Sequence, residues 1–148
     1  MRHSAFRPSV LVLVLLVTPG APFASGADGE PVALGKTWDG EVKIALRDRA
    51  PGDGYVADKA AWEKLWKSYQ PDAKVPEIDF AKELVLVAVN RDPNQISISA
   101  TLDAGGNLTV RHASTKIGFP NPETCKYQFA AIKREGIKTI NGKPLGGK

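Results

Sequence analysis

Three segments of the chain alternate apolar and polar residues with a period of two, which is typical of half-buried strands. They are residues 38–46, 96–102 and 108–111. A short glycine-bearing loop joins the last two, so we expect them to form a hairpin. Residues 84–89 are continuously apolar, which indicates a strand buried on both faces at the centre of a sheet. A fifth strand is expected at residues 127–132, where aromatic side chains occupy alternate positions.

One segment has the spacing of an amphipathic helix. Its large apolar residues fall at positions i, i+3, i+4 and i+7 and form a single stripe: Trp62, Leu65, Trp66 and Tyr69. Asp58 stands where an N-cap carboxylate would accept backbone N–H groups, and Pro71 marks the far end. Because two tryptophans on one short helix can bury a large area, we expect the helix to lie flat across a sheet.

The end of the chain adds one more strand and completes the fold prediction. The pair Asn141-Gly142 is a strong hairpin signal, and Pro144 makes the strand that follows an edge strand. About six strands and one helix, with connections too short for repeated parallel crossovers, predict an α+β fold. We expect an antiparallel sheet or sandwich with the amphipathic helix packed on it. Residues 38–148 are predicted to form this single domain, preceded by a mobile leader at residues 28–37.

The first 27 residues have the pattern of a secretory signal peptide. Arg2 and Arg7 provide the positive start, residues 10–17 the apolar stretch, and residues 24–27 a cleavage region of small side chains. Eight consecutive apolar residues are far fewer than the roughly 20 that a membrane-spanning helix needs. We therefore predict an exported protein, periplasmic or secreted, with no membrane anchor after cleavage.

Charge and cysteine content restrict the classes of partner and scaffold. The whole chain has a net charge of +4, but the first 27 residues carry two Arg and no acidic residue, so the remaining 121 residues carry only +2. Their Lys and Arg are interspersed with Asp and Glu, so we predict no binding of nucleic acid. Cys125 is the only cysteine, which excludes an internal disulfide.

Catalytic chemistry has few candidate residues. His112 is the only histidine after residue 27, and a catalytic triad would also need a serine and an acid beside it. Glu77 and Asp79 are two residues apart, so an extended segment would present both carboxylates on one side, as acid and base in glycoside hydrolysis require. Solvated charges beside buried neighbours explain the same pattern. We predict no metal site and no cofactor, because Cys125 and His112 cannot form a metal site alone.

Three stretches together suggest a family. They are residues 61–66 (AWEKLW), 76–80 (PEIDF) and 134–145 (REGIKTINGKPL). The chain resembles small exported bacterial domains named after the C-terminal part of the protease-complex stability protein PrcB. The resemblance covers about residues 42–145 and implies an accessory role, in which the domain stabilises or docks to another exported protein. It supplies no active site to transfer.

Two functional hypotheses follow. The first is an exported, non-enzymatic accessory or binding domain, whose protein partner would contact an apolar patch. The candidate patch residues are Trp38, Tyr55, Ile117 and Phe119. The alternative is a small exported hydrolase that uses His112 or the Glu77 and Asp79 pair. The sequence specifies neither the partner nor the oligomeric state.

Overall fold

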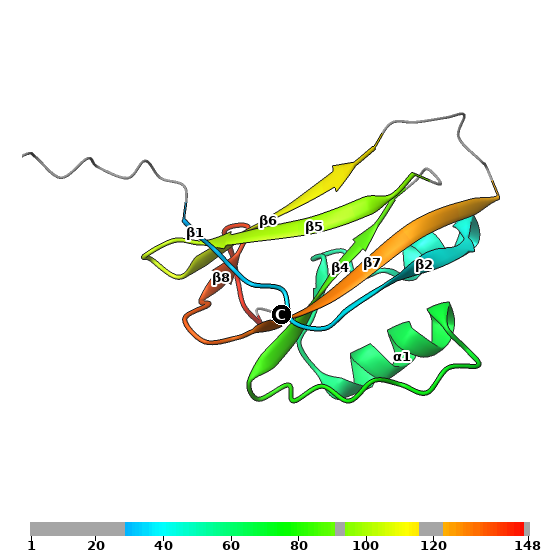
Figure 1. Ribbon diagram of the computed structural model, residues 1–148. Helices are drawn as coiled ribbons and strands as arrows, with labels where there is room; N and C mark the ends of the chain where they lie inside the picture. Colours follow the sequence, from blue (N-terminus) through cyan, green and yellow to red (C-terminus); the bar gives the residue numbers. More distant parts are fainter. Residues whose placement is uncertain (1–28, 91–93, 116–122, 147–148) are drawn as a thin grey trace, which may run out of the picture.

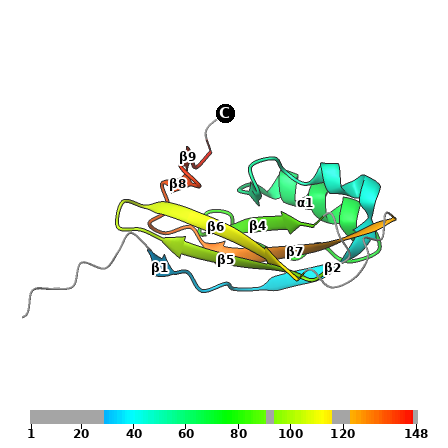
Figure 2. The ribbon, with the colours of Figure 1, turned by 90° about the horizontal axis from the view of Figure 1, so that it is seen from above.

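The computed structural model describes residues 29–90, 94–115 and 123–146. It shows three layers: the main helix, a four-stranded sheet in the middle, and a five-stranded sheet on the other side (Figures 1 and 2). The elements in chain order are β1 (Glu30–Pro31), β2 (Thr37–Lys43), the 3-10 helix η1 (Ile44–Arg49), β3 (Tyr55–Val56), α1 (Lys59–Tyr69), β4 (Glu83–Val89), β5 (Ile96–Leu102), β6 (Asn107–Ser114), β7 (Thr124–Lys133), β8 (Thr139–Ile140) and β9 (Lys143–Pro144).

The two sheets confirm the predicted α+β sandwich with one packed helix. Sheet A has the strand order β1-β5-β6-β8-β9, and sheet B has the order β2-β7-β4-β3. All neighbouring strands are antiparallel except β6 and β8. The nine strands of the described residues exceed the six expected by β1, β3 and β8, each of which has two residues, too few to give a periodic pattern.

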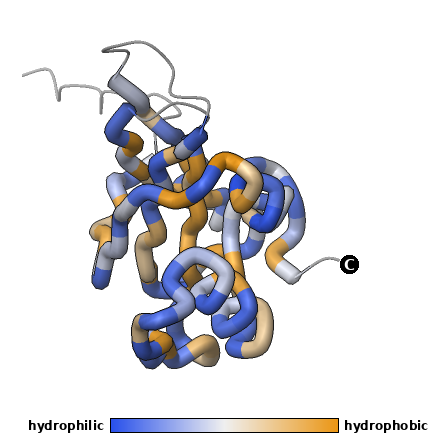
Figure 3. Tube along the Cα trace, turned by 90° about the vertical axis from the view of Figure 1, so that its right-hand side faces the viewer, coloured by the Kyte–Doolittle hydropathy of each residue, from blue (hydrophilic) through white to orange (hydrophobic). Residues whose placement is uncertain are grey.

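Strand β4 is an interior strand of sheet B, as its continuous apolar sequence predicts. Leu84, Leu86 and Ala88 face sheet A, whereas Val85 and Val87 face the helix. Both faces of sheet B are therefore covered, and each covers a separate hydrophobic cluster. Figure 3 shows the most hydrophobic stretches of backbone running through the middle of the molecule.

Helix α1 lies on the outer face of sheet B, with its four predicted apolar residues buried. Asp58 is its N-cap, since one side-chain oxygen accepts a hydrogen bond from the N–H of Ala61 at 2.8 Å. The helix ends at Tyr69, two residues before Pro71. The rings of Trp62 and Phe129 meet edge to face at 5.6 Å. These contacts confirm the predicted helix and its cap.

A close approach between β2 and β7 depends on a glycine. The ring of Tyr127 crosses Gly40, and a Cβ at Gly40 would lie 2.8 Å from the Tyr127 hydroxyl oxygen. The ring is fully buried, and its hydroxyl accepts a hydrogen bond from the side-chain amide of Gln70 at 2.6 Å. Gly40 therefore provides the space for an aromatic ring beneath α1.

The strand predicted at residues 38–46 is shorter in the structure. Strand β2 ends at Lys43, which pairs with Thr124 at the start of β7. The N–H of Ile44 donates to the carbonyl of Glu123 at 2.9 Å, and from there the chain turns into η1 although its apolar alternation goes on. Leu46 then accepts a hydrogen bond from the Tyr69 hydroxyl at 3.0 Å. The apolar alternation therefore continues into a 3-10 helix, so periodicity alone places the end of this strand too late.

The segment that we predict as a leader, residues 28–37, is attached to both sheets from Glu30 onward. Strand β1 pairs with β5, and the N–H of Val32 donates to the carbonyl of Ala100 at 2.9 Å. The N–H of Gly35 then donates to the carbonyl of Ala131 at 2.8 Å, and β2 continues along β7. Each sheet receives only a few residues of this crossing segment, so no periodicity marks it. The predicted signal peptide, residues 1–27, lies outside the described residues.

The predicted turn near the C-terminus is present. Asn141 and Gly142 connect β8 to β9, with φ angles of 49° and 79°. Positive φ at both central positions is the signature of a type I′ turn, which Asn-Gly favours. The Asn141 side chain accepts a hydrogen bond from the N–H of Val110 at 2.9 Å. The hairpin is thereby joined to β6.

Candidate functional site

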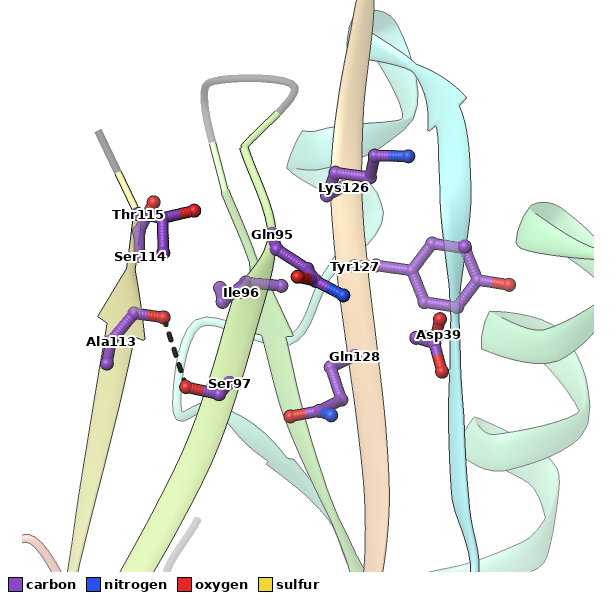
Figure 4. A pocket seen from close by; sticks show the side chains of 11 residues that line it. Asp39, Gln95, Ile96, Ser97, Ala113, Ser114, Thr115, Lys126, Tyr127 and Gln128 are labelled. Carbon is purple, nitrogen blue, oxygen red and sulfur yellow. Dashed lines mark hydrogen bonds between the residues drawn. The ribbon is translucent and has the colours of Figure 1, made fainter. Parts of the chain in front are cut away.

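A cleft opens between the two sheets, at the end of the sandwich where β5 begins. Its volume is about 480 Å³, and it is lined by residues of β2, β5, β6 and β7 (Figure 4). The cleft exists because the crossing segment leaves β5 at Ala100 and joins β7, so that no strand of the described residues lies along this edge of β5 beyond Ala100. The lining residues are Asp39, Gly40, Gln95, Ile96, Ser97, Ala113, Ser114, Thr115, Lys126, Tyr127 and Gln128.

The edge of β5 is open inside this cleft. The Ala100 carbonyl faces this edge, because it accepts the hydrogen bond from Val32. Backbone groups of every second residue point to the same edge of an antiparallel strand, so those of Ile98 and Ile96 face it too. Among the described residues, no strand lies beside them. The N–H of Ile98 instead donates to the side-chain oxygen of Gln128 at 2.7 Å.

The charged groups of the cleft leave one carboxylate without a partner. Lys126 forms an ion pair with Glu41 at 2.8 Å, and this hydrogen bond lowers the pKa of the Glu41 carboxyl. Asp39 lies opposite Gln128 in the pairing of β2 with β7 and makes no hydrogen bond or ion pair with any described residue. Among the described residues that line the cleft, Asp39 is therefore the charged group without an ion-pair partner, and it lies beside the open edge of β5.

Polar side chains at the mouth of the cleft are held by the fold. The Ser97 hydroxyl donates to the carbonyl of Ala113 at 3.4 Å, and the Asn90 side-chain amide donates to the Ser114 hydroxyl at 2.5 Å. In Figure 4, Gln128 lies between β5 and β7, whereas the ring of Tyr127 points across β2 toward the helix. The cleft thus offers hydroxyl groups, amides and main-chain groups. These are groups that recognise polar ligands rather than nucleophiles with an adjacent base.

No hydrogen bond or ion pair joins the candidate catalytic residues to one another in the described structure. His112 is exposed on β6 opposite Ile98, no hydrogen bond joins it to a described residue, and partial desolvation of its ring lowers its pKa. Asp79 accepts a hydrogen bond from the N–H of Ala81 at 3.1 Å and forms an ion pair with Lys82 at 3.2 Å. Its role in the structure is to close a turn before β4. The neighbouring Glu77 is exposed and forms no ion pair with a described residue.

The structure separates the two predicted patch residues that it describes. Trp38 is half-buried on the helix side of β2, with its ring centre 5.5 Å from that of Trp62. Tyr55 is on β3, at the opposite edge of sheet B, and packs against the cluster between the sheets. The two residues therefore lie on opposite edges and opposite faces of sheet B. The other two predicted patch residues, Ile117 and Phe119, lie outside the described residues.

Sequence reasoning missed the cleft, although β7 carries a signal for it. Cys125, Tyr127 and Phe129 are buried, whereas Lys126 and Gln128 between them are polar and only partly buried. A strand in the middle of a sheet with polar residues on one face indicates that this face is not fully covered at that end. The Cys125 thiol itself is fully buried, and burial raises its pKa, which disfavours the reactive thiolate.

No protein-family model, curated protein or solved structure matches this chain. Within the described residues, no three His, Cys, Asp or Glu side chains are grouped so that they could hold a metal ion. No helix of the described part is long and apolar enough to span a bilayer. The function therefore has to be inferred from the cleft and its chemistry.

Proposed function

We propose that this protein is an exported, non-enzymatic accessory domain that binds an exported protein partner through the cleft between its two sheets. The observation that carries this proposal is the open edge of β5 inside the cleft. Unpaired main-chain groups at a sheet edge are a ready-made binding surface for another polypeptide. A position between two sheets, next to several polar side chains, makes such binding specific rather than a route to aggregation.

The composition of the cleft favours binding over catalysis. A hydrolase needs a nucleophile or a base within hydrogen-bonding distance of a second polar group that orients it. In the cleft, the hydroxyl groups of Ser97 and Ser114 are bonded to a carbonyl and to an amide, respectively. Asp39 has no histidine beside it, because His112 does not line the cleft. The cleft residues thus suit recognition of a polypeptide.

Export is supported by the signal-peptide pattern of residues 1–27 and by the accessory role that the resemblance to PrcB-type domains implies. If this is right, the protein isolated from its producing cells begins close to Asp28, three residues or fewer before β1. N-terminal sequencing or intact mass spectrometry of the isolated protein checks this. Retention of the apolar stretch at residues 10–17 in the isolated protein would contradict export with cleavage.

A site-specific photo-crosslinker tests the binding site. The probe is p-benzoylphenylalanine in place of Gln95, an exposed residue of the cleft, with the probe at Lys67 on the exposed side of α1 as the matched control. We expect a discrete adduct in the producing cells from position 95 and none from position 67. A second change, Thr115→Trp, fills the cleft and should abolish the adduct. Equal labelling from both positions, or an adduct that survives Thr115→Trp, would refute the cleft as the site.

A further inference from the structure

We propose that the cleft takes an extended peptide segment that adds to β5 as a new strand of sheet A and places a basic side chain opposite Asp39. This inference rests on the proposed function and names the chemical class of its partner. It combines three observations: the open edge of β5, a side chain that occupies part of that edge, and the unpaired carboxylate beside it.

The same edge of β5 already pairs with a strand, β1, at its other end. Strand β1 pairs with Leu102 and Thr101, and Val32 extends the ladder to Ala100. An incoming strand in line with β1 would continue this ladder along Ile98 and Ile96, using backbone groups that face the cleft. It would lie about 4.8 Å from β5 and about 10 Å above sheet B, which are the ordinary spacings within and between sheets. The cleft volume of about 480 Å³ provides this space.

The side chain of Gln128 satisfies part of this edge in place of a neighbouring strand. Its oxygen accepts the hydrogen bond of the Ile98 N–H at 2.7 Å, the position that a backbone carbonyl of a neighbouring strand would occupy. An unsatisfied N–H at a partly covered edge is unfavourable, so the Gln128 side chain stabilises the protein when no peptide is bound. A bound peptide exchanges this hydrogen bond for one of its own and gains further bonds at Ile96. Gln128 therefore competes with the peptide.

The charge of Asp39 favours a bound peptide with a basic side chain. Every second side chain of an added strand would point toward sheet B, where Asp39 and Gln128 face sheet A side by side. Lys126 already forms an ion pair with Glu41, so among the described residues Asp39 provides the unpaired charge that the peptide would meet. A lysine or arginine at that position would pair with Asp39, whereas an acidic residue would be repelled. The opposite side of the strand would continue the outer face of sheet A beside Ser97 and Ser99, which favours polar residues there.

Synthetic peptides test the inference on the full mature protein labelled with ¹⁵N. The first peptide has about seven residues, a length typical of strands, and alternates threonine with lysine. Its lysine side chains would point toward sheet B, and its threonine side chains would continue the outer face of sheet A. The second has glutamate in place of each lysine. The third repeats the first but carries N-methyl groups on the amides that would face β5, which removes the backbone donors and leaves the side chains unchanged.

We expect the lysine peptide to shift the backbone amide signals of Ile96 and Ile98 most strongly, and the glutamate peptide to bind at least roughly fivefold more weakly. The N-methylated peptide should not bind. Asp39→Asn should remove the preference for lysine without abolishing binding, and Gln128→Ala should tighten binding because the competing side chain is gone. Asp39 is exposed, so its substitution should leave the fold intact.

Binding that persists after N-methylation, or shifts located away from β5, would overturn strand addition. A lysine preference unaffected by Asp39→Asn would overturn the charge assignment. If the crosslinked adduct forms at position 95 but none of the three peptides binds, the cleft remains the binding site and the peptide class is wrong. If no adduct forms and no peptide binds, the proposed function fails as well.

Discussion

The contact between Gly40 and Tyr127 allows a quantitative test of the packing beneath α1. A Cβ added at Gly40 would lie 2.8 Å from the hydroxyl oxygen, 2.9 Å from Cε1 and 3.0 Å from Cζ of Tyr127. The ring cannot move freely, because its centre lies 4.6 Å from that of Phe129 and 5.1 Å from that of Tyr69. The hydrogen bond from Gln70 also fixes the hydroxyl. Gly40→Ala should therefore force a rearrangement inside a packed core.

The expected loss can be estimated from two opposing effects. Overpacking of a well-packed core costs about 1–3 kcal/mol. Replacing a glycine whose φ is not positive restricts the unfolded chain and returns about 0.4–1 kcal/mol. The net expectation is a loss of about 1–2 kcal/mol in the free energy of unfolding. Urea unfolding followed by tryptophan fluorescence measures it, with Gly52→Ala as the matched control, because no heavy atom lies within 4 Å of a Cβ at Gly52.

A double-mutant cycle identifies the cause. In a Tyr127→Leu background, the ring that collides with the added methyl group is absent, so Gly40→Ala should become neutral or slightly stabilising there. The coupling free energy between the two positions should then be about 1–3 kcal/mol, which is the overpacking cost alone. If Gly40→Ala is as harmless as Gly52→Ala, or if its cost is the same in both backgrounds, the steric reasoning is wrong. An unchanged m-value would show that the substitution acts on stability and not on the compactness of either state.

Three further predictions concern local features. Asp58→Ala should lower the free energy of unfolding by about 1 kcal/mol in the same assay, because the N-cap of α1 is lost, whereas Asp58→Asn should retain most of it. Gly106→Ala should destabilise by about 1–3 kcal/mol, since Gly106 has a φ of 89° and a Cβ would lie 2.7 Å from the Gly136 carbonyl oxygen. Burial raises the pKa of Tyr69 from 10.0 to about 12, so the native state keeps a proton that the unfolded state loses. Stability should therefore fall as pH rises from 10 to 12, and Tyr69→Phe should flatten that slope in pH-dependent unfolding.

Local patterns predicted much of the fold. The helix with its cap at Asp58, the interior strand at residues 84–89, the β5–β6 hairpin and the turn at Asn141 all depend on neighbouring residues, and all are present. The two-residue strands β1 and β3 could not be predicted, because they are strands only through their partners in β5 and β4. The end of β2 likewise falls at the last residue pair that it forms with β7, Lys43 with Thr124.

The candidate site was harder to predict than the fold. Aromatic residues such as Trp38 are typical of binding patches, but here the ring packs against two tryptophans of the helix. The cleft depends on where the crossing segment leaves one sheet for the other, which is a property of the whole topology. Asp39 and Gln128 are 89 positions apart in the sequence and become neighbours only when β2 pairs with β7. No local pattern links them.

The position of β7 in the chain has a consequence for when this protein can fold. Both β2 and β4 pair with β7, yet β7 begins at Thr124, so the middle layer stays incomplete until the last sixth of the chain is present. Contacts between residues this far apart form slowly. In the proposed export, the chain could thread through a narrow translocation channel without first having to unfold a finished domain. Strand β7, which completes the middle layer, would be among the last segments to cross.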